Sequence, residues 1–374
     1  MKKNKVLDII TSTTSGLDAV EVIPLVDLDS VLQRTLEHLQ KGMMPSTYRW
    51  TESKTRYAYS YKNYSRWARS IIVAAKYYHT GEPYQSDPLF GRIAPFSWRN
   101  NYLYITLQLE QALEALEKYM GKKIKARVLS NYTSIPEKPL FRYSGLGEAG
   151  RNSVLINPHM GSYFCVGEML TELEVEDFAN PPSPAPPDFS ICGECFRCIK
   201  ACPTGAITGP GAVNINRCFQ YLSENLVVVP RKWRNRWGPR LYGCSTCLEV
   251  CPYNQRLTPW AEKHQVGYVG TGMHLPDVLK LSPQQWDLRF QNNQIARRES
   301  LAIVKNAVLA LGCSGNRWCL EAIRDFLEHP SPVIRATAAW AVGNINTPSG
   351  NKKLEELYKK EEDPEVRKEI EYFL

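Results

Sequence analysis

The sequence predicts an α+β protein in three parts: an N-terminal domain of helices and strands, a cysteine-rich middle part, and a C-terminal region of short helical repeats. Helical and strand patterns alternate up to about residue 177. Eight of the eleven cysteines fall between residues 192 and 251, and short similar segments recur after residue 298. Because 374 residues exceed one typical domain, we place domains at 1–177, 178–290 and 291–374.

The N-terminal part combines amphipathic helices with a buried strand. LDSVLQRTLEHLQKG (28–42) and YITLQLEQALEALEKYM (104–120) place apolar residues three and four positions apart, as helices that bury one face do. Between them, SIIVAAKYY (70–78) is apolar with polar neighbours, which is typical of a buried strand. The proline-rich segment FANPPSPAPPDFS (178–190) then predicts an extended inter-domain linker or a lining segment, because proline lacks a backbone donor and favours extended backbone.

The C-terminal part repeats itself. VKNAVLALG (304–312) recurs as RATAAWAVG (335–343), and HPSPVIR (329–335) recurs as DPEVR (363–367), each with an offset of 31 to 32 residues. Repeats of this length predict HEAT-like helix pairs, each of which buries its apolar face on the next pair. The alternative interpretation is an ordinary helical subdomain.

The cysteine spacing predicts two 4Fe-4S clusters. A run C-x2-C-x2-C-x3-C-P begins at Cys192, and a second run C-x2-C-x3-C-P begins at Cys244, with Cys218 ahead of it. In the bacterial two-cluster ferredoxin arrangement, the fourth cysteine of each run ligates the other cluster. We therefore assign one cluster to Cys192, Cys195, Cys198 and Cys251, and the other to Cys202, Cys218, Cys244 and Cys247. Zinc is the alternative, but it does not explain three thiols at double x2 spacing followed by Cys-Pro.

Composition limits the other possibilities. No apolar run reaches eighteen residues and the N-terminus lacks a signal-peptide pattern, so we expect a cytoplasmic protein with no membrane span. We interpret Cys165, Cys313 and Cys319 as packed core thiols. A Rossmann fingerprint, a P-loop and the corrinoid pattern D-x-H-x-x-G are absent, so a corrinoid would bind without a protein ligand to its cobalt.

Five segments together resemble one family. RYSGLGEAGRNSVLINPHMGSYFCVGEMLTEL (142–173), the cysteine runs, INRCFQYLSEN (215–225) and HPSPVIRATAAWAVGNI (329–345) look like epoxyqueuosine reductase, in the same order from about Tyr57 onward. The resemblance implies base-off cobalamin bound in an N-terminal α/β domain. It also implies electron passage through two 4Fe-4S clusters to cobalt, and reduction of the epoxide of epoxyqueuosine in the tRNA anticodon loop. Reductive dehalogenases have similar cobalamin and cluster domains, but the helical repeats favour the tRNA-modifying branch.

One position departs from the family. Where the family places an aspartate as proton donor, fourteen residues before Gly145, this chain has Asn131. An amide has no proton to release near neutral pH, so Asn131 can orient a substrate but cannot act as a general acid. Glu137, Tyr132, Tyr143 or water would have to replace it. The alternatives are therefore a paralogous corrinoid reductase with a non-tRNA substrate, or an electron-transfer protein for a corrinoid partner.

By the same resemblance, a cobalamin pocket is expected in the first half of the chain. Its candidate residues are Ser97, Trp98, Tyr102, Asn131, Lys138, Gly145, Ser153, Leu155 and Tyr163. Lys138 would pair with a corrinoid phosphate or a propionamide oxygen. For each aromatic residue, core packing is the alternative interpretation, and for Lys138 it is a solvated surface position.

A basic stretch suggests contact with RNA. PRKWRNRWGPR (230–240) interleaves Arg231, Lys232, Arg234, Arg236 and Arg240 with Trp233 and Trp237, and cations with flat rings suit a single-stranded loop. Arg297, Arg298, Lys305 and Arg335 would extend this surface. Alternatively, the arginines neutralise cluster charge and the tryptophans shield it. We expect a monomer that receives electrons from an external low-potential donor.

Overall fold

The structure is a computed structural model that describes residues 1–45, 51–131, 135–178, 185–298 and 300–374. Tyr132 and part of the proline-rich segment lie outside these residues. Contacts divide the chain into two compact units, each assembled from separate stretches of sequence. Unit 1 comprises Met1–Gly81, Asn100–Asn216 and Thr246–Val266, and unit 2 comprises Glu82–Arg99, Arg217–Ser245 and Gly267–Leu374.

Unit 1 is built on a four-stranded antiparallel sheet. In spatial order the strands are β1 (Ala19–Pro24), β2 (Ser70–Tyr77), β7 (Phe164–Thr171) and β4 (Ala126–Ser130). All eight residues of β2 are buried, which confirms the strand predicted from its apolar run. A strand with both faces covered does not alternate polar and apolar residues.

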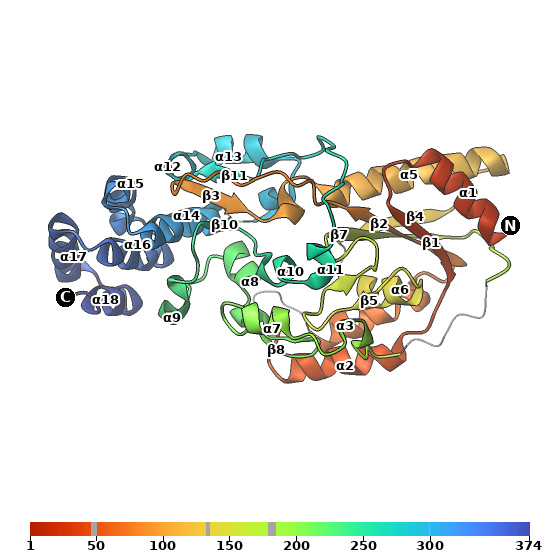
Figure 1. The fold of residues 1–374 in the computed structure, drawn as a ribbon, viewed down its shortest axis with the longest axis horizontal. Helices are drawn as coiled ribbons and strands as arrows, with labels where there is room; N and C mark the ends of the chain where they lie inside the picture. Colours follow the sequence, from red (N-terminus) through yellow and green to blue (C-terminus); the bar gives the residue numbers. More distant parts are fainter. Residues whose placement is uncertain (46–50, 132–134, 179–184, 299) are drawn as a thin grey trace. The chain divides into compact units, whose positions relative to one another are not determined.

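Helices cover both faces of this sheet (Figure 1). One face carries α1 (Lys3–Thr13) and α5 (Asn101–Met120), and the opposite side carries α2 (Asp29–Gln40), α3 (Glu52–Tyr59) and α6 (Glu137–Tyr143). The short helix α4 (Tyr61–Tyr64) follows α3 in the chain. The predicted helices at 28–42 and 104–120 are therefore confirmed. Helix α5 begins earlier than predicted because the Asn100 side chain accepts a hydrogen bond from the Leu103 N–H and caps it. It packs so closely that a Cβ atom on Gly167 of β7 would lie 2.5 Å from Ile105.

The part of unit 1 that carries cysteines consists of short elements. They are β5 (Glu148–Ala149), β6 (Leu155–Ile156), α7 (Arg197–Ala201), β8 (Ile207–Gly209), β9 (Ala212–Val213), α10 (Thr246–Glu249) and α11 (Pro252–Gln255). Each Cys-Pro pair marks a helix end. Cys202 caps the C-terminus of α7 ahead of Pro203, and Cys251 is the N-cap of α11 with Pro252 in its first turn. Proline suits these positions because it cannot donate inside a helix but fits its start.

Unit 2 contains a three-stranded sheet in the order β10 (Arg240–Tyr242), β3 (Phe90–Ile93) and β11 (Gly272–His274). Its shorter helices are α8 (Phe219–Glu224), α9 (Arg231–Arg234), α12 (Leu275–Val278) and α13 (Pro283–Phe290). Single 3-10 turns elsewhere in the chain are η2 (Pro95–Ser97), η3 (Ser190–Cys192), η4 (Ile215–Arg217), η5 (Gln294–Arg297), η6 (Arg317–Cys319) and η7 (Arg324–Glu328).

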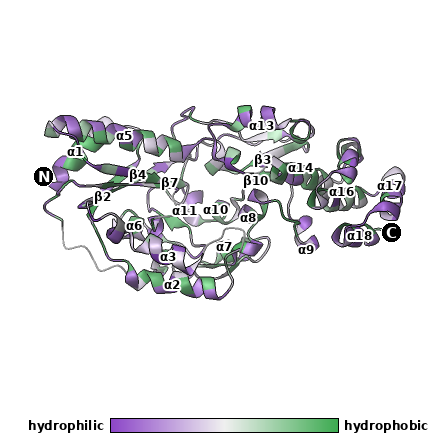
Figure 2. Ribbon diagram, turned by 180° about the vertical axis from the view of Figure 1, so that it is seen from behind, coloured by the Kyte–Doolittle hydropathy of each residue, from purple (hydrophilic) through white to green (hydrophobic). Residues whose placement is uncertain are grey.

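Unit 2 ends in a helical array. Its helices are α14 (Ser300–Ser314), α15 (Leu320–Ile323), α16 (Pro332–Ile345), α17 (Pro348–Lys360) and α18 (Pro364–Glu371). Figure 2 shows α14 and α16 as mainly hydrophobic and α17 and α18 as mainly hydrophilic. The repeated glycines allow close packing, because a Cβ atom on Gly312 would lie 2.6 Å from Ala341 Cβ, and one on Gly343 would collide with Phe373. The predicted helical repeats are confirmed.

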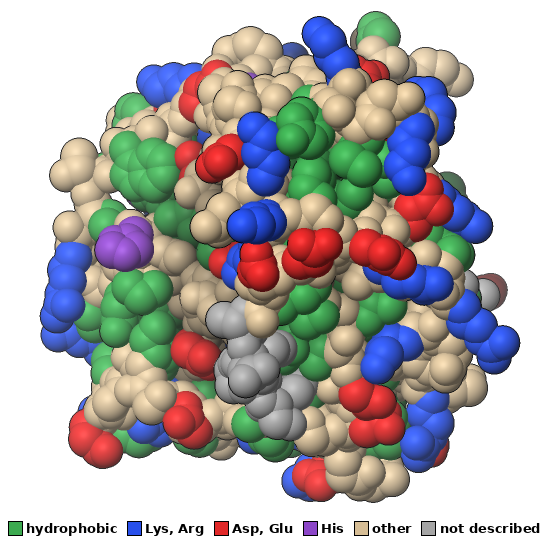
Figure 3. Space-filling view, turned by 90° about the vertical axis from the view of Figure 1, so that its right-hand side faces the viewer, with side chains coloured by type: hydrophobic (Ala, Val, Ile, Leu, Met, Phe, Trp, Pro, Cys, Tyr) green, Lys and Arg blue, Asp and Glu red, His purple; other side chains and the backbone are tan. Residues whose placement is uncertain are grey.

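Within the described residues, no helix is both long and apolar enough to cross a membrane. The molecular face drawn in Figure 3 carries acidic and basic side chains interspersed with apolar ones.

Candidate iron–sulfur and cofactor sites

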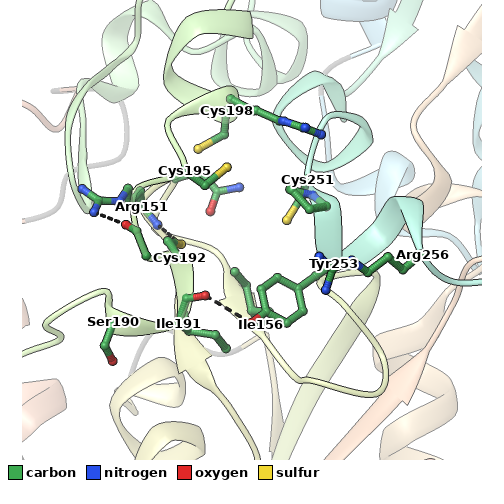
Figure 4. Close-up of a pocket in the computed structure, with 14 residues that line it drawn as sticks. Arg151, Ile156, Ser190, Ile191, Cys192, Cys195, Cys198, Cys251, Tyr253 and Arg256 are labelled. Atoms are coloured by element: carbon green, nitrogen blue, oxygen red, sulfur yellow. Dashed lines mark hydrogen bonds between the residues drawn. The ribbon is translucent and has the colours of Figure 1, made fainter.

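The four cysteines assigned to the first cluster surround one cavity in unit 1 (Figure 4). Cys192, Cys195, Cys198 and Cys251 line a space of about 400 Å³, and all four thiols are free. Each of these residues is partly exposed. Four thiols around one space are the donor set of a 4Fe-4S cluster, so the residues fit the predicted group.

Local backbone geometry brings three of these thiols together. The Cys195 N–H donates to the Cys192 carbonyl at 2.9 Å, which closes a tight turn. Gly193 within this turn has φ of +48°, a region that residues with a Cβ atom rarely occupy. Helix α7 then carries Cys198. Cys251 joins from α11, and the Tyr253 hydroxyl fastens that segment by donating to the Ile191 carbonyl at 3.1 Å.

The surroundings of the cavity change the pKa values of its thiols. Burial and the neighbouring Cys192 raise the pKa of Cys198, and burial raises the pKa of Cys251. These thiols must therefore release protons when they bind metal. The Arg151 N–H donates to Cys192 Sγ at 3.4 Å. Hydrogen bonds of this kind stabilise thiolate charge and tune cluster potential.

The cysteines assigned to the second cluster are divided between the two units. Cys202 and Cys247 belong to unit 1, whereas Cys218 and Cys244 belong to unit 2, so their grouping remains a prediction from spacing. Burial raises the pKa of Cys202, but backbone donors including the N–H groups of Ile207 and Ala206 outweigh that effect and the net shift is downward. A lower pKa favours the thiolate form of Cys202, and the thiolate is the form that binds metal.

The remaining cysteines are packed. Cys165 on β7 and Cys319 are buried, and Cys313 donates to the Arg234 carbonyl at 3.0 Å. Burial raises the pKa of Cys165 to about 12 and that of Cys313 to about 11. The expectation of core thiols is therefore confirmed for Cys165 and Cys319, because a high pKa and burial leave a thiol unreactive.

Several residues predicted for the cobalamin pocket lie in unit 1. Tyr102 at the start of α5 hydrogen-bonds Cys165, and Leu155 and Tyr163 are buried. Lys138 on α6 donates to the Ser153 carbonyl at 2.8 Å, and Ser153 itself has φ of +64°. The side chain of Lys138 is accessible, yet desolvation lowers its pKa, so the ammonium is partly enclosed by protein instead of extending into bulk solvent.

Two further predicted residues of this pocket are exposed. Gly145 follows Ser144, the C-cap of α6, with φ of +77°, and a Cβ atom there would contact nothing, so backbone conformation rather than space requires glycine. Asn131 follows β4 with φ of +54°, which asparagine tolerates better than most residues. It directly precedes residues 132–134, which are not described.

Ser97 and Trp98 lie in unit 2, and their polar groups are bonded there. The Trp98 indole N–H donates to the Ile93 carbonyl at 2.7 Å, and the Gln294 amide donates to Ser97 Oγ at 3.1 Å. Both residues are fully buried within unit 2. Their assignment to the cobalamin pocket stays a prediction.

Sequence reasoning missed two polar residues near this predicted pocket. Glu168 on β7 is fully buried, and neither of its carboxyl oxygens has a hydrogen-bond partner in the described part of the chain. Burial, then the charge of Glu137, raises its pKa well above the usual range. The His79 ring lies 4.5 Å from the Tyr163 ring, and its Nδ1 is buried with no partner among the described residues. The glutamate inside the apolar run YFCVGEML was the available signal.

The interpretation of residues 230–240 as an RNA-binding surface is wrong for several of its members. Trp237 is fully buried, Trp233 is almost so, and Arg234 is buried in an ion pair with Glu369 at 2.6 Å. Among the residues proposed to extend the surface, Lys305 is fully buried and Arg335 pairs with Glu361 at 2.7 Å. Buried rings cannot stack on bases, and arginines paired with a carboxylate are not available to bind RNA phosphates. Lys232 and Arg236 remain exposed.

Comparisons with known proteins agree with these features. Residues 191–254 match a 4Fe-4S double cluster binding domain, and residues 293–374 match HEAT repeats. The chain is 31% identical over 283 residues to the epoxyqueuosine reductase of Bacillus subtilis (strain 168), covering 74% of this chain and 70% of that protein. It is 29% identical over 308 residues to the enzyme of Staphylococcus aureus (strain NCTC 8325 / PS 47), covering 81% and 79%.

Solved structures are similar over the full length. The chain resembles an epoxyqueuosine reductase crystallised with an epoxyqueuosine-modified tRNA-Tyr stem loop, with a TM-score of 0.85, 27% identity and coverage of 99% of this chain and 96% of that one. Fold, double-cluster domain and helical repeats together define an iron–sulfur oxidoreductase. The chain belongs to the epoxyqueuosine reductase family.

Proposed function

We propose that this protein reduces the epoxide of epoxyqueuosine in tRNA to give queuosine. The observation that carries the proposal is the likeness, over 99% of this chain, to a relative solved with an epoxyqueuosine-modified tRNA stem loop. The double-cluster match supports it, because the reaction needs an electron supply. The predicted cytoplasmic location, the monomeric state and the external low-potential donor belong to this proposal.

The chemistry balances with two electrons and two protons. They convert the epoxide to an alkene and release its oxygen as water. Iron–sulfur clusters transfer electrons one at a time, so a second centre has to collect a pair before the carbon–oxygen bonds break. Cobalamin, bound without a protein ligand to cobalt, would supply that two-electron chemistry.

The residues of unit 1 fit such a corrinoid. Its rim carries amides and a phosphate, which need hydrogen-bond donors, acceptors and a cation. Lys138 offers an ammonium with one identified acceptor, the Ser153 carbonyl, and His79 offers a ring nitrogen without a partner in the described residues. Desolvation lowers the pKa of His79, which favours the neutral imidazole and leaves one ring nitrogen as an acceptor. Tyr102, Leu155 and Tyr163 would form the wall.

The proton for the epoxide oxygen requires an acid other than Asn131. We infer that Glu137, with Glu168 behind it, holds this proton. Glu137 begins α6 and is partly exposed, whereas Glu168 is fully buried and burial raises its pKa well above the usual range, which favours the protonated acid. A buried carboxylic acid beside a second carboxyl group retains a proton because two neighbouring charges in a dry site repel each other. Asn131 would orient the substrate.

One observation favours a second candidate function. Asn131 stands where the resemblance places a catalytic aspartate, which suits a paralogous corrinoid reductase with a non-tRNA substrate. A pure electron-transfer role for a corrinoid partner is a third candidate. This last role requires clusters but no cobalamin of the chain's own.

One anaerobic experiment separates the three candidates. The protein is reconstituted with iron, sulfide and cobalamin, and its iron and cobalt are measured. It is then reduced with dithionite and incubated with tRNA that carries epoxyqueuosine. We expect about eight iron and one cobalt per chain and conversion to queuosine in chromatography of the digested tRNA. Retained cobalt without conversion supports the paralogue, and iron without cobalt supports the electron-transfer protein.

A further inference from the structure

The cavity of the first cysteine set is surrounded by cations as well as thiols. Arg151, Arg197 and Arg256 line it together with the four cysteines, and Lys200 follows on α7. The same short segments carry three exposed carboxylates, Asp188, Glu194 and Glu249. Four cations against three carboxylates give this rim a small positive excess.

These cations do not all serve the cysteines. Arg151 is used internally: its N–H donates to Cys192 Sγ, its guanidinium donates to the Gly193 carbonyl at 2.5 Å, and it lies 4.3 Å from the Phe196 ring. Arg197, Lys200 and Arg256 are exposed instead, and within the described residues none of them forms an ion pair. Charge neutralisation of a cluster would place arginines inward, as Arg151 is placed. Because Arg197, Lys200 and Arg256 are exposed, they are also accessible to a partner outside.

The rim is one continuous surface of unit 1. The Arg197 guanidinium donates to Gln255 Oε1 at 3.2 Å, which joins the segment after Cys195 to the segment after Cys251. Between these cations, the Phe196 side chain is 37% exposed and lies next to Cys195 in sequence. An exposed aromatic residue on a surface that also carries exposed Arg and Lys residues is the composition of a protein-binding hot spot with a steering rim.

Cys247, from the other cysteine set, also belongs to unit 1. Burial raises the pKa of Tyr78, and the charges of Cys165, Tyr163 and Cys247 raise it further, so Cys247 is a close neighbour of this residue. Tyr78 also contacts Tyr163, with ring centroids 5.9 Å apart. The first set has partly exposed thiols and a basic rim within the same unit, so a donor that docks at this rim would lie next to these thiols.

We propose that the surface formed by Phe196, Arg197, Lys200 and Arg256 docks an acidic, low-potential electron-transfer protein, which delivers electrons to the first cluster. This inference rests on the proposed function, because that reaction needs an external donor. Each docking transfers one electron from the donor's reduced cofactor, and two successive dockings supply the pair that the epoxide reduction consumes. RNA is the less suitable occupant, because electrons have to enter at a cluster and the first cysteine set lies at this rim.

The test uses the cluster-loaded protein, photoreduced flavodoxin as the acidic donor, and the double variant Arg197→Glu with Arg256→Glu. Stopped-flow bleaching of cluster absorption gives the second-order rate constant. We expect the variant to be reduced on the order of tenfold more slowly at low salt, because opposed charges steer association. The wild-type rate should fall steeply with ionic strength and the variant rate should not. The dissociation constant for oxidised flavodoxin should rise in parallel.

Two controls isolate the contribution of the docking surface. Lys122→Glu makes the same kind of charge change at an exposed position of unit 1 away from the rim and should leave the rate unchanged. Dithionite needs no docking surface, so it should reduce the double variant as fast as wild type and drive equal conversion of epoxyqueuosine.

Equal reduction of variant and wild type by flavodoxin would overturn the docking proposal. A variant that instead loses tRNA binding, with normal flavodoxin reduction, would assign the surface to RNA. Failure of wild type with dithionite would concern the proposed function alone.

Discussion

Arg234 and Glu369 form a buried two-point ion pair within unit 2: Arg234 Nη1 lies 2.6 Å from Glu369 Oε2, and Nη2 lies 2.9 Å from Oε1. The pair joins α9, in the basic stretch that follows Cys218, to α18, the last helix of the repeats. A bidentate arginine–carboxylate pair is geometrically specific, and removing one partner leaves the other charge buried and uncompensated.

Glu369→Ala should therefore destabilise unit 2 by about 3 kcal/mol or more. Glu356→Ala is the matched control, because Glu356 pairs with Lys353 on an exposed helix surface at 3.1 Å. Its loss should cost well under about 1 kcal/mol. For each variant, the shift in the urea midpoint of the helical-repeat unfolding transition measures the loss of stability. Equal small shifts would mean that water reaches the Arg234 guanidinium.

Removal of a first-set thiol should cost one cluster. In Cys195→Ser we expect iron to fall from about eight to about four per chain, with the loss of one paramagnetic species in the reduced protein. Cys319→Ser removes a buried thiol of unit 2 that is not assigned to a cluster, and its iron content should match wild type. If Cys195→Ser keeps all its iron, the ligand assignment is wrong.

Lys305 makes stability depend on pH in the alkaline range. It is fully buried, donates to the carbonyls of Leu222 and Asn225, and desolvation lowers its pKa to about 7. Between about pH 7 and 10.5 the unfolded lysine is protonated and the folded one is not, so stability rises with pH. The slope from this group approaches about 1.4 kcal/mol per pH unit.

Lys305→Met should remove that slope. The comparison is the unfolding midpoint of wild type and variant at several pH values from 7 to 10, where shared contributions cancel in the difference. Lys232→Met, at an exposed position of the same unit, should leave the slope intact. A slope unchanged in Lys305→Met would show that the ammonium stays charged and is held by its two carbonyls.

Glu168 should have the opposite effect on stability. Its pKa is raised, so above the ordinary glutamate range the unfolded carboxyl is ionised while the folded one keeps its proton. Stability then falls as pH rises, until the folded group also ionises. Glu168→Gln replaces a neutral acid with a neutral amide of similar shape and should be stable at pH 7 but lose this downward slope.

The same variant tests the proton source. If Glu168 supplies the proton that Glu137 delivers, Glu168→Gln should slow epoxide reduction under dithionite by about a hundredfold or more, as loss of a general acid does. Glu172→Gln, an exposed carboxylate just beyond the end of β7, serves as control. Normal turnover in Glu168→Gln would exclude this route and leave water or another acid of the chain as the source.

Asn131→Asp restores an acid at the position where the resemblance places one. We expect faster conversion of epoxyqueuosine at low pH, with a new ionisation in the pH–rate profile, since an aspartic acid donates only while protonated. Asn131→Ala measures the contribution of orientation by the amide. If Asn131→Asp is no faster than wild type, the chain's own proton source already suffices.

Much of the fold and part of the site could be predicted from the sequence, because the relevant signals are local. Helix α5 follows from apolar spacing, β2 from an unbroken apolar run, and the array of α14 and α16 from a repeated segment. The first cysteine set follows in the same way. Three of its four thiols lie within seven residues, so a tight turn suffices to bring them to one cavity.

Only the tertiary structure decided which polar residues lie at the surface and are available to bind a partner. Arg234 and Lys305 look like surface cations in the sequence. In the structure Arg234 is paired with a glutamate 135 residues away, and Lys305 donates to carbonyls about 80 residues away. Burial between strands that meet it across the sheet raises the pKa of Glu168. Periodicity and spacing report what neighbours in the chain do together. Burial and charge compensation depend on partners that are distant in sequence, and a single sequence does not record those distances.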